Sequence, residues 1–137
     1  LMPHMFIGLL EDEPRLMNSV GAWVMQQVCR CVIAWRRQRP KSRLPIAVNL
    51  SRVQLTTPGF AQQLQGLVHA HAIDPGDICL EVTETAFVHS QHVLVEALER
   101  LRDAGYRVAI DDFGVGHSSL AALHHLPSLS RARKERI

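Results

Sequence analysis

Cysteine, net charge and long apolar runs are all scarce in this chain of 137 residues, and each scarcity argues against a class of protein. The three cysteines, Cys29, Cys31 and Cys79, are odd in number and include no CxxC pair. This pattern argues against a disulfide framework or a zinc site and favours reduced thiols in the cytoplasm. A formal net charge of +2 is too small to indicate binding to a nucleic acid polymer or an anionic membrane. No apolar run is long enough to span a bilayer, and no signal-peptide pattern is present.

The composition that remains is that of a soluble globular protein, with 47% apolar and 20% charged residues. A chain of this length can bury one modest core, so a single domain is expected. Apolar residues at three- and four-residue steps predict a long amphipathic helix over Pro14–Arg37. Its expected packing face is formed by Leu16, Val20, Trp23, Val24, Val28, Cys31 and Trp35. Other helical segments are expected within 1–13 (a short buried helix or turn), after the start signal Thr56-Thr57-Pro58, between Ser90 and Gly105, and over Ser118–Leu126.

Three short apolar runs alternate with these helices and predict strands at Leu44–Ser51, Ile78–Glu84 and Tyr106–Asp112. Such alternation is typical of parallel strands joined by helical crossovers. Polar residues end the strands at a near-constant interval, because Asn49 precedes Glu81 by 32 residues and Glu81 precedes Asp111 by 30. A (β/α)8 barrel has about 31 residues in each of its eight units, and a doubly wound sheet gives a similar spacing.

The stretch Arg107–Leu120, RVAIDDFGVGHSSL, holds the strongest chemical signal. Two adjacent carboxylates, Asp111 and Asp112, end a buried strand and precede a glycine-containing turn into a helix. One interpretation is that one aspartate caps the helix and the other is solvated. The other is that a divalent cation compensates both charges, because two neighbouring acids at a buried strand end repel each other.

In a parallel sheet all carboxyl ends lie at one edge, so Asn49, Glu81, Asp111 and Asp112 are expected to converge there. One amide oxygen and three carboxylates form an oxygen-only ligand set, which suits Mg²⁺ or Mn²⁺. A second ion beside Asp112 would make a two-metal site of the kind that hydrolyses phosphodiesters. Glu84 is expected just beyond its strand, where it would accept hydrogen bonds from the Gly114–Gly116 loop.

Three motifs in this order, NLS at Asn49–Ser51, EVTE at Glu81–Glu84 and DDFGVGHSSL at Asp111–Leu120, resemble the EAL domain family. The resemblance implies a partial (β/α)8 TIM-type barrel, here about three parallel strands with flanking helices. It implies hydrolysis of cyclic di-GMP to pGpG in bacterial second-messenger signalling, with Mg²⁺ or Mn²⁺ as cofactor. It also implies metal ligation by Asn49, Glu81, Asp111 and Asp112. Catalytic roles then belong to Asp112, which with Asp111 would span the two ions, and to Glu84, which would steady the loop 113–119.

The sequence departs from the family pattern in three places. Val115 and His117 replace a threonine and a tyrosine in the aspartate loop. The Glu-Ala-Leu motif of the first barrel strand is not found ahead of these motifs, and a basic segment follows Pro127 in place of the next strand. We therefore expect residues 1–127 to be a partial EAL domain and 128–137 to be a disordered tail.

These departures leave three hypotheses open. The chain is an EAL phosphodiesterase by descent that is inactive as it stands, a non-catalytic cyclic di-GMP-binding or protein-interaction module, or a gene product without activity. Incomplete barrels have open sheet edges, which favour pairing as a homodimer. The expected setting is a larger multidomain signalling protein in the cytoplasm, with no membrane contact from this segment.

Overall fold

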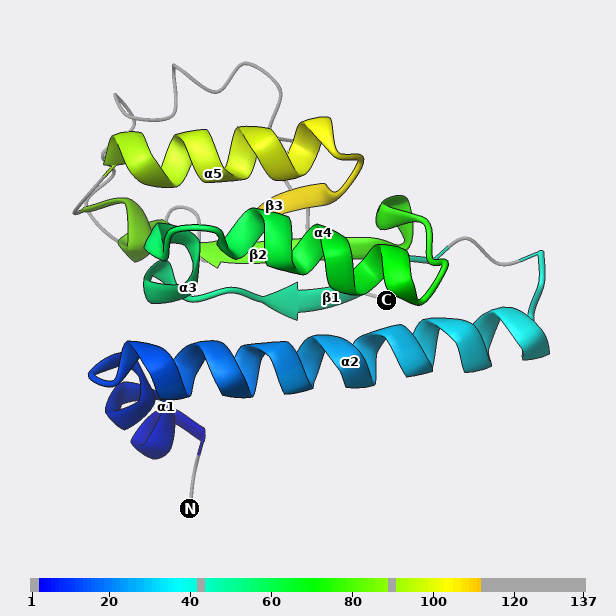
Figure 1. Ribbon diagram of the computed structural model, residues 1–137, viewed down its shortest axis with the longest axis horizontal. Coiled ribbons are helices and arrows are strands. Elements are labelled where there is room, and N and C mark those ends of the chain that lie inside the picture. Colours follow the sequence, from blue (N-terminus) through cyan, green and yellow to red (C-terminus); the bar gives the residue numbers. More distant parts are fainter. Residues whose placement is uncertain (1–2, 42–43, 89–90, 112–137) are drawn as a thin grey trace.

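The computed structural model describes residues 3–41, 44–88 and 91–111 as an alternation of helices and parallel strands (Figure 1). The strands pair in the order β1-β2-β3, and both pairings are parallel. This arrangement confirms the prediction of about three parallel strands with flanking helices. The elements are α1 (Pro3–Glu11), α2 (Pro14–Gln38), β1 (Ile46–Asn49), α3 (Arg52–Thr56), α4 (Phe60–Ala70), the 3-10 turn η1 (Pro75–Asp77), β2 (Ile78–Thr83), the 3-10 helix η2 (Glu84–Val88), α5 (Gln91–Asp103) and β3 (Arg107–Asp111).

One face of the sheet packs against helices, whereas the other carries polar side chains. Alternate strand residues such as Val48, Leu80 and Val108 are buried in one apolar cluster with the inner faces of α2, α4 and α5. On the opposite face, Asn49 is exposed and Glu81 is partly buried. Helices on one side and polar side chains on the other match one sector of a (β/α) barrel, in which the second face is the barrel interior.

The packing face of α2 differs from the predicted one. Its buried residues are Met25, Cys29 and Val32, whereas Trp23 is 61% exposed and Trp35 is 37% exposed. The Trp35 ring lies 5.1 Å from the guanidinium carbon of Arg39, a cation–π contact at the helix end. The prediction that both tryptophans lie on the packing face is therefore wrong, because the helix turns a slightly different face to the sheet. Cys31, which was also expected on the packing face, is exposed, whereas Cys29 is buried.

Two further predictions about local structure are wrong. The segment 1–13 does form a helix, but Phe6, Ile7 and Leu9 are at least 40% exposed, so α1 is not a buried helix. Thr57 caps the end of α3, and α4 begins at Phe60 after Gly59, whose φ of 81° favours glycine. The proline therefore lies in the link between two helices and does not begin the second one.

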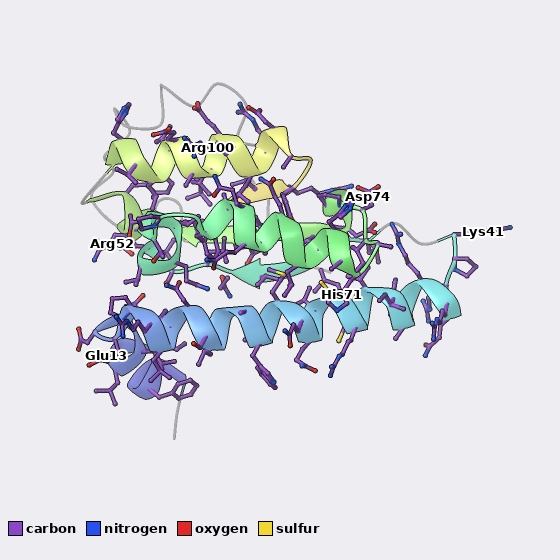
Figure 2. All side chains as sticks on the ribbon, viewed as in Figure 1. Glu13, Lys41, Arg52, His71, Asp74 and Arg100 are labelled. Carbon is purple, nitrogen blue, oxygen red and sulfur yellow. The ribbon has the colours of Figure 1, made fainter. Side chains whose placement is uncertain are left out.

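Polar contacts tie together the amino-terminal edge of the sheet. Asp77, 8% exposed, forms an ion pair with Arg36 near the end of α2. The Asp74 carboxylate accepts a hydrogen bond from the Gly76 amide, at the turn labelled in Figure 2. The Arg107 Nε–H at the start of β3 donates to the Gly76 carbonyl at 3.1 Å. These contacts fix the start of β2 against both α2 and β3, and so help to set the register of the sheet.

Tyr106 precedes β3 and offers a test of this packing. It is 3% exposed, its hydroxyl has no hydrogen-bond partner among the described residues, and it is the chain's only tyrosine. Burial, with a smaller contribution from Cys29, raises the pKa of Tyr106 to about 12 from its ordinary value of 10.0. The fold therefore favours the protonated phenol, so its contribution to stability is complete below pH 10 and is lost as the pH rises toward 12.

We expect absorbance at 295 nm to report a single phenol titrating near pH 12 in the folded chain and near pH 10 in urea. Tyr106→Phe should remove this alkaline loss of stability. Because it also deletes an unpartnered buried hydroxyl, it should leave the free energy of unfolding at pH 7 unchanged or raise it by about 1 kcal/mol. A folded-state titration near pH 10 would show that the phenol is solvated.

Candidate metal site at the carboxyl edge of the sheet

Asn49 and Glu81 lie side by side where β1 and β2 approach their carboxyl ends. They are direct partners in the parallel register, and the Leu50 amide donates to the Glu81 carbonyl at 2.8 Å. Asn49 ends β1 and is exposed, whereas Glu81 is partly buried. The two strands thus bring together an amide and a carboxylate that stand 32 residues apart in sequence.

The other predicted site residues lie farther along the chain direction or outside the described residues. Asp111 ends β3 and pairs with Thr83 of β2. The residue of β3 that pairs with Glu81 is Ala109, so Asp111 lies two residues farther along the strand direction than Glu81. Glu84 follows β2 directly and begins η2. Asp112 lies outside the described residues, as do the loop 113–119, the predicted helix Ser118–Leu126 and the tail 128–137. The predicted strand Tyr106–Asp112 is therefore described only as Arg107–Asp111, and Ser90 also falls outside.

The donors at this edge are suited to a hard cation. Cys79 precedes Glu81 by two residues, and burial, followed by the charge of Glu81, raises the pKa of its thiol, while Arg107 lowers it. Asn49 and Glu81 themselves offer an amide oxygen and a carboxylate, which are the kinds of donor that hard cations prefer. Within the described residues, no group of three or more His, Cys, Asp and Glu side chains is arranged to hold an ion. Asn49 and Glu81 alone therefore do not make up a complete metal site within the described residues.

The turn after β1 contains a helix that the sequence analysis missed. Ser51 begins α3 with a reciprocal capping box, in which its side chain accepts from the Gln54 amide and the Gln54 side chain accepts from the Ser51 amide. The signal was present as S-x-x-Q at positions 51–54, a known pattern for a helix start.

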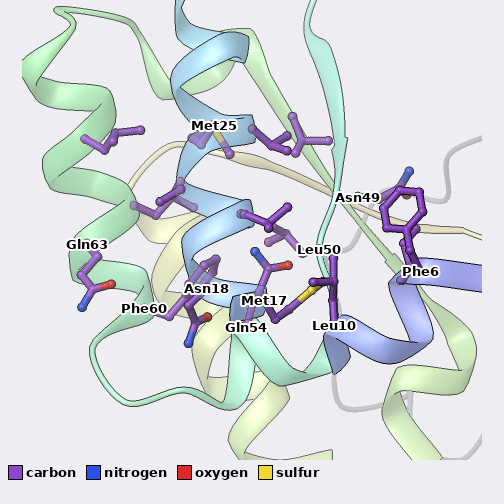
Figure 3. A pocket seen from close by; sticks show the side chains of 18 residues that line it. Phe6, Leu10, Met17, Asn18, Met25, Asn49, Leu50, Gln54, Phe60 and Gln63 are labelled. Atoms are coloured by element: carbon purple, nitrogen blue, oxygen red, sulfur yellow. The ribbon is translucent and has the colours of Figure 1, made fainter. Parts of the chain in front are cut away.

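A cavity of about 380 Å³ opens beside this turn, between α1, α2, β1 and α4 (Figure 3). Its walls are mostly apolar, with Asn49 and Gln54 among the polar residues that line it. Phe6 of α1 and Asn49, the last residue of β1, both line the cavity, so it reaches the carboxyl edge of the sheet (Figure 3). No substrate-binding residue is expected from the sequence, and of the predicted site residues that the structure describes, Asn49 alone lines the cavity.

The triplet Glu96-Ala97-Leu98 occurs within α5 and has no part in this edge. Glu96 forms an exposed ion pair with Arg100 at 2.6 Å, one helical turn along. A glutamate on the outer surface of a crossover helix cannot replace one at the end of a barrel strand. The sequence Glu-Ala-Leu therefore occurs in this chain on a helix, and not on a barrel strand as in the family motif.

Three parallel strands, helices on one face and oxygen donors at the carboxyl edge define an α/β-barrel type of protein with a candidate cation site. The family model of the EAL domain matches residues 1–128, and the chain belongs to the EAL domain family.

Similar proteins agree with this membership. The Pseudomonas aeruginosa protein MucR, described as a bifunctional diguanylate cyclase/cyclic di-GMP phosphodiesterase, is 33% identical over 128 residues, which cover 93% of this chain and 18% of MucR. The solved PaMucR phosphodiesterase in complex with c-di-GMP matches with a TM-score of 0.80 and 33% identity, covering 93% of this chain and 54% of that structure. The EAL enzyme Bd1971, solved with cAMP and cyclic di-GMP, matches with a TM-score of 0.77 and 29% identity, covering 90% of this chain and 34% of that one.

The chain thus spans about half of the solved MucR domain and less than a fifth of the curated MucR protein. These matches confirm that the fold is part of a barrel. In the described part of the chain, no helix combines the length and the apolar character needed to cross a bilayer.

Proposed function

We propose that this chain carries one part of the active site of a cyclic di-GMP phosphodiesterase. The observation that carries the proposal is the register partnership of Asn49 and Glu81 at the carboxyl edge of a parallel sheet in a member of the EAL family. The c-di-GMP complex of MucR supports the choice of ligand, because that structure matches 93% of this chain.

In this proposal Asn49 and Glu81 donate oxygen ligands from adjacent strands, and Asp111 and Asp112 add carboxylates from the end of β3 and the residue after it. The oxygen-only set favours Mg²⁺ or Mn²⁺, which supplies an activated water and offsets charge on the phosphodiester. Glu84 would hold the following loop, and Asp111 and Asp112 would together supply carboxylates to the metal. The Leu50 and Ser51 amides are both hydrogen-bonded, which keeps the backbone after Asn49 in place.

We further propose that residues 1–127 are the EAL portion and 128–137 a separate tail, within a multidomain signalling protein that works in the cytoplasm. MucR supports the multidomain setting, because the match occupies 18% of its length. The outer edges of β1 and β3, which have no strand partner among the described residues, favour a homodimer in this proposal.

Turnover of cyclic di-GMP to pGpG, followed by chromatography with Mn²⁺ present, tests the proposed function. The unsubstituted chain is compared with Asp111→Ala, and calorimetry measures cyclic di-GMP binding by both. Turnover that Asp111→Ala abolishes supports the phosphodiesterase. Metal-dependent binding without turnover supports a non-catalytic cyclic di-GMP-binding module instead. A cooperatively folded chain with neither binding nor turnover contradicts both.

A further inference from the structure

The chain that leaves β1 is closed into a fixed turn by one side chain, that of Gln54. The Ser51 amide donates to Gln54 Oε1 at 3.0 Å, and the Gln54 amide donates to Ser51 Oγ at 3.2 Å. Both bonds lie in a partly buried setting, where an unpaired amide is costly. Ser51 follows Asn49 by two residues, so this hydrogen-bonded ring begins directly beyond the proposed metal ligand.

The Gln54 side chain is itself held from the other side by α2. It is only 4% exposed, although glutamine usually lies at the surface. Its Nε2 lies against Gly21 so closely that a Cβ at position 21 would overlap it. The absence of a side chain at Gly21 therefore gives Gln54 its place between α2 and the turn.

The residue between Asn49 and this ring is fixed as well. Leu50 is 6% exposed and its amide is bonded to the carbonyl of Glu81, the partner of Asn49. Asn49 is thus paired with β2 within the strand, Leu50 is bonded to β2 just after it, and Ser51 is bonded to Gln54. Release of Ser51 would leave the backbone after Asn49 with one fixed point in place of two.

We propose that Gln54 is a positioning residue that sets the direction of the Asn49 side chain, and that contact with Gly21 locks it in place. This inference rests on the proposed function, because it gives Gln54 its effect through Asn49 as a metal ligand. Groups that orient metal ligands typically change metal affinity by about 10- to 100-fold when they are removed. An effect at the lower end of that range is expected here, since Asn49 is one ligand among several.

Three variants separate positioning from a general effect on the fold. Gln54→Met keeps the length of the side chain and removes the acceptor. Gln54→Glu keeps an acceptor for the Ser51 amide, as the capping-box pattern allows. Gln63→Met is the matched control, because Gln63 lines the same cavity from α4, is exposed and lies outside the capping box.

The experiment measures two quantities on each full chain: the Kd for Mn²⁺, from the free-ion electron paramagnetic resonance signal, and amide hydrogen exchange at Leu50 and Ser51. We expect Gln54→Met to raise the Kd by about 10-fold and to speed exchange at Ser51 by a similar factor. In Gln54→Glu, both the Kd for Mn²⁺ and the exchange rate at Ser51 should stay within about 3-fold of the unsubstituted chain. Gln63→Met should change neither quantity.

Unchanged exchange at Ser51 in Gln54→Met, or faster exchange with an unchanged Kd for Mn²⁺, would overturn the positioning role and leave the proposed function standing. A folded, unsubstituted chain that binds no Mn²⁺ would overturn the metal site of the proposed function, and the positioning role with it. The two failures are therefore distinguishable.

Discussion

Replacing Glu81 by glutamine should raise the Kd of the chain for Mn²⁺ by about 100-fold or more, and this is the largest functional effect that we expect. The substitution keeps the shape of the side chain and the pairing of Glu81 with Asn49 in the sheet, but it removes the negative charge. Hard divalent cations are held mainly by charged oxygen donors, so an amide at this position is a much weaker ligand. Titration with Mn²⁺, monitored by the signal of the free ion, measures the change.

Glu96→Gln is the control for this prediction. It makes the same chemical change within the Glu96-Ala97-Leu98 triplet of α5, on an exposed helix surface. The Kd for Mn²⁺ should stay within about 2-fold of the unsubstituted chain, because loss of one surface ion pair has little effect. Equal effects of the two substitutions would show that Mn²⁺ binds to this chain through diffuse surface charge.

Replacing Leu80 by alanine should lower the free energy of unfolding by about 3 kcal/mol, which is the largest effect on stability that we expect. Leu80 lies in the central strand, is fully buried and pairs with Val48 on one side and Val108 on the other. Its removal leaves a cavity between the sheet and the covering helices. A domain of this size is stable by only about 5–15 kcal/mol, so the change is a large part of the total.

Urea denaturation followed by tryptophan fluorescence measures this loss. Val93→Ala provides the control, because Val93 is 49% exposed on α5 and should cost less than about 0.5 kcal/mol. If Leu80→Ala cost no more than Val93→Ala, the cluster around Leu80 would not be the close-packed core described here.

The proximity of Asn49 and Glu81 was predictable from the sequence because it follows from one rule: parallel strands present their carboxyl ends at one edge. The register of β3 against β2, which decides how far Asp111 lies from Glu81, was not predictable in the same way. Its partner is Thr83, and the stagger between neighbouring strands depends on tertiary packing that no short segment encodes.

The errors on α2 and at the Gln54 turn have a common physical cause. The apolar character of Trp23 and Trp35 predicted that they would lie on the packing face of α2, but both are exposed. The helix instead turns Gly21 inward, where the missing side chain makes room for Gln54. Burial of Gln54 is favourable only because both ends of the reciprocal hydrogen-bond pair are supplied by the same short turn. Periodicity measures the apolar character of a face, whereas close approach depends on small residues and satisfied polar groups.

The parallel pairing of the strands also has a kinetic consequence. Asn49 meets Glu81 across 32 residues, and Cys79 meets Arg107 across 28, so neither strand pair can form as a local hairpin. Each pairing must close a long loop before the sheet contributes any stability, which raises the contact order and slows folding. During synthesis, β1 therefore cannot pair with β2 until β2 has left the ribosome, and the edge of β1 that faces β2 is open to association with other chains for that interval.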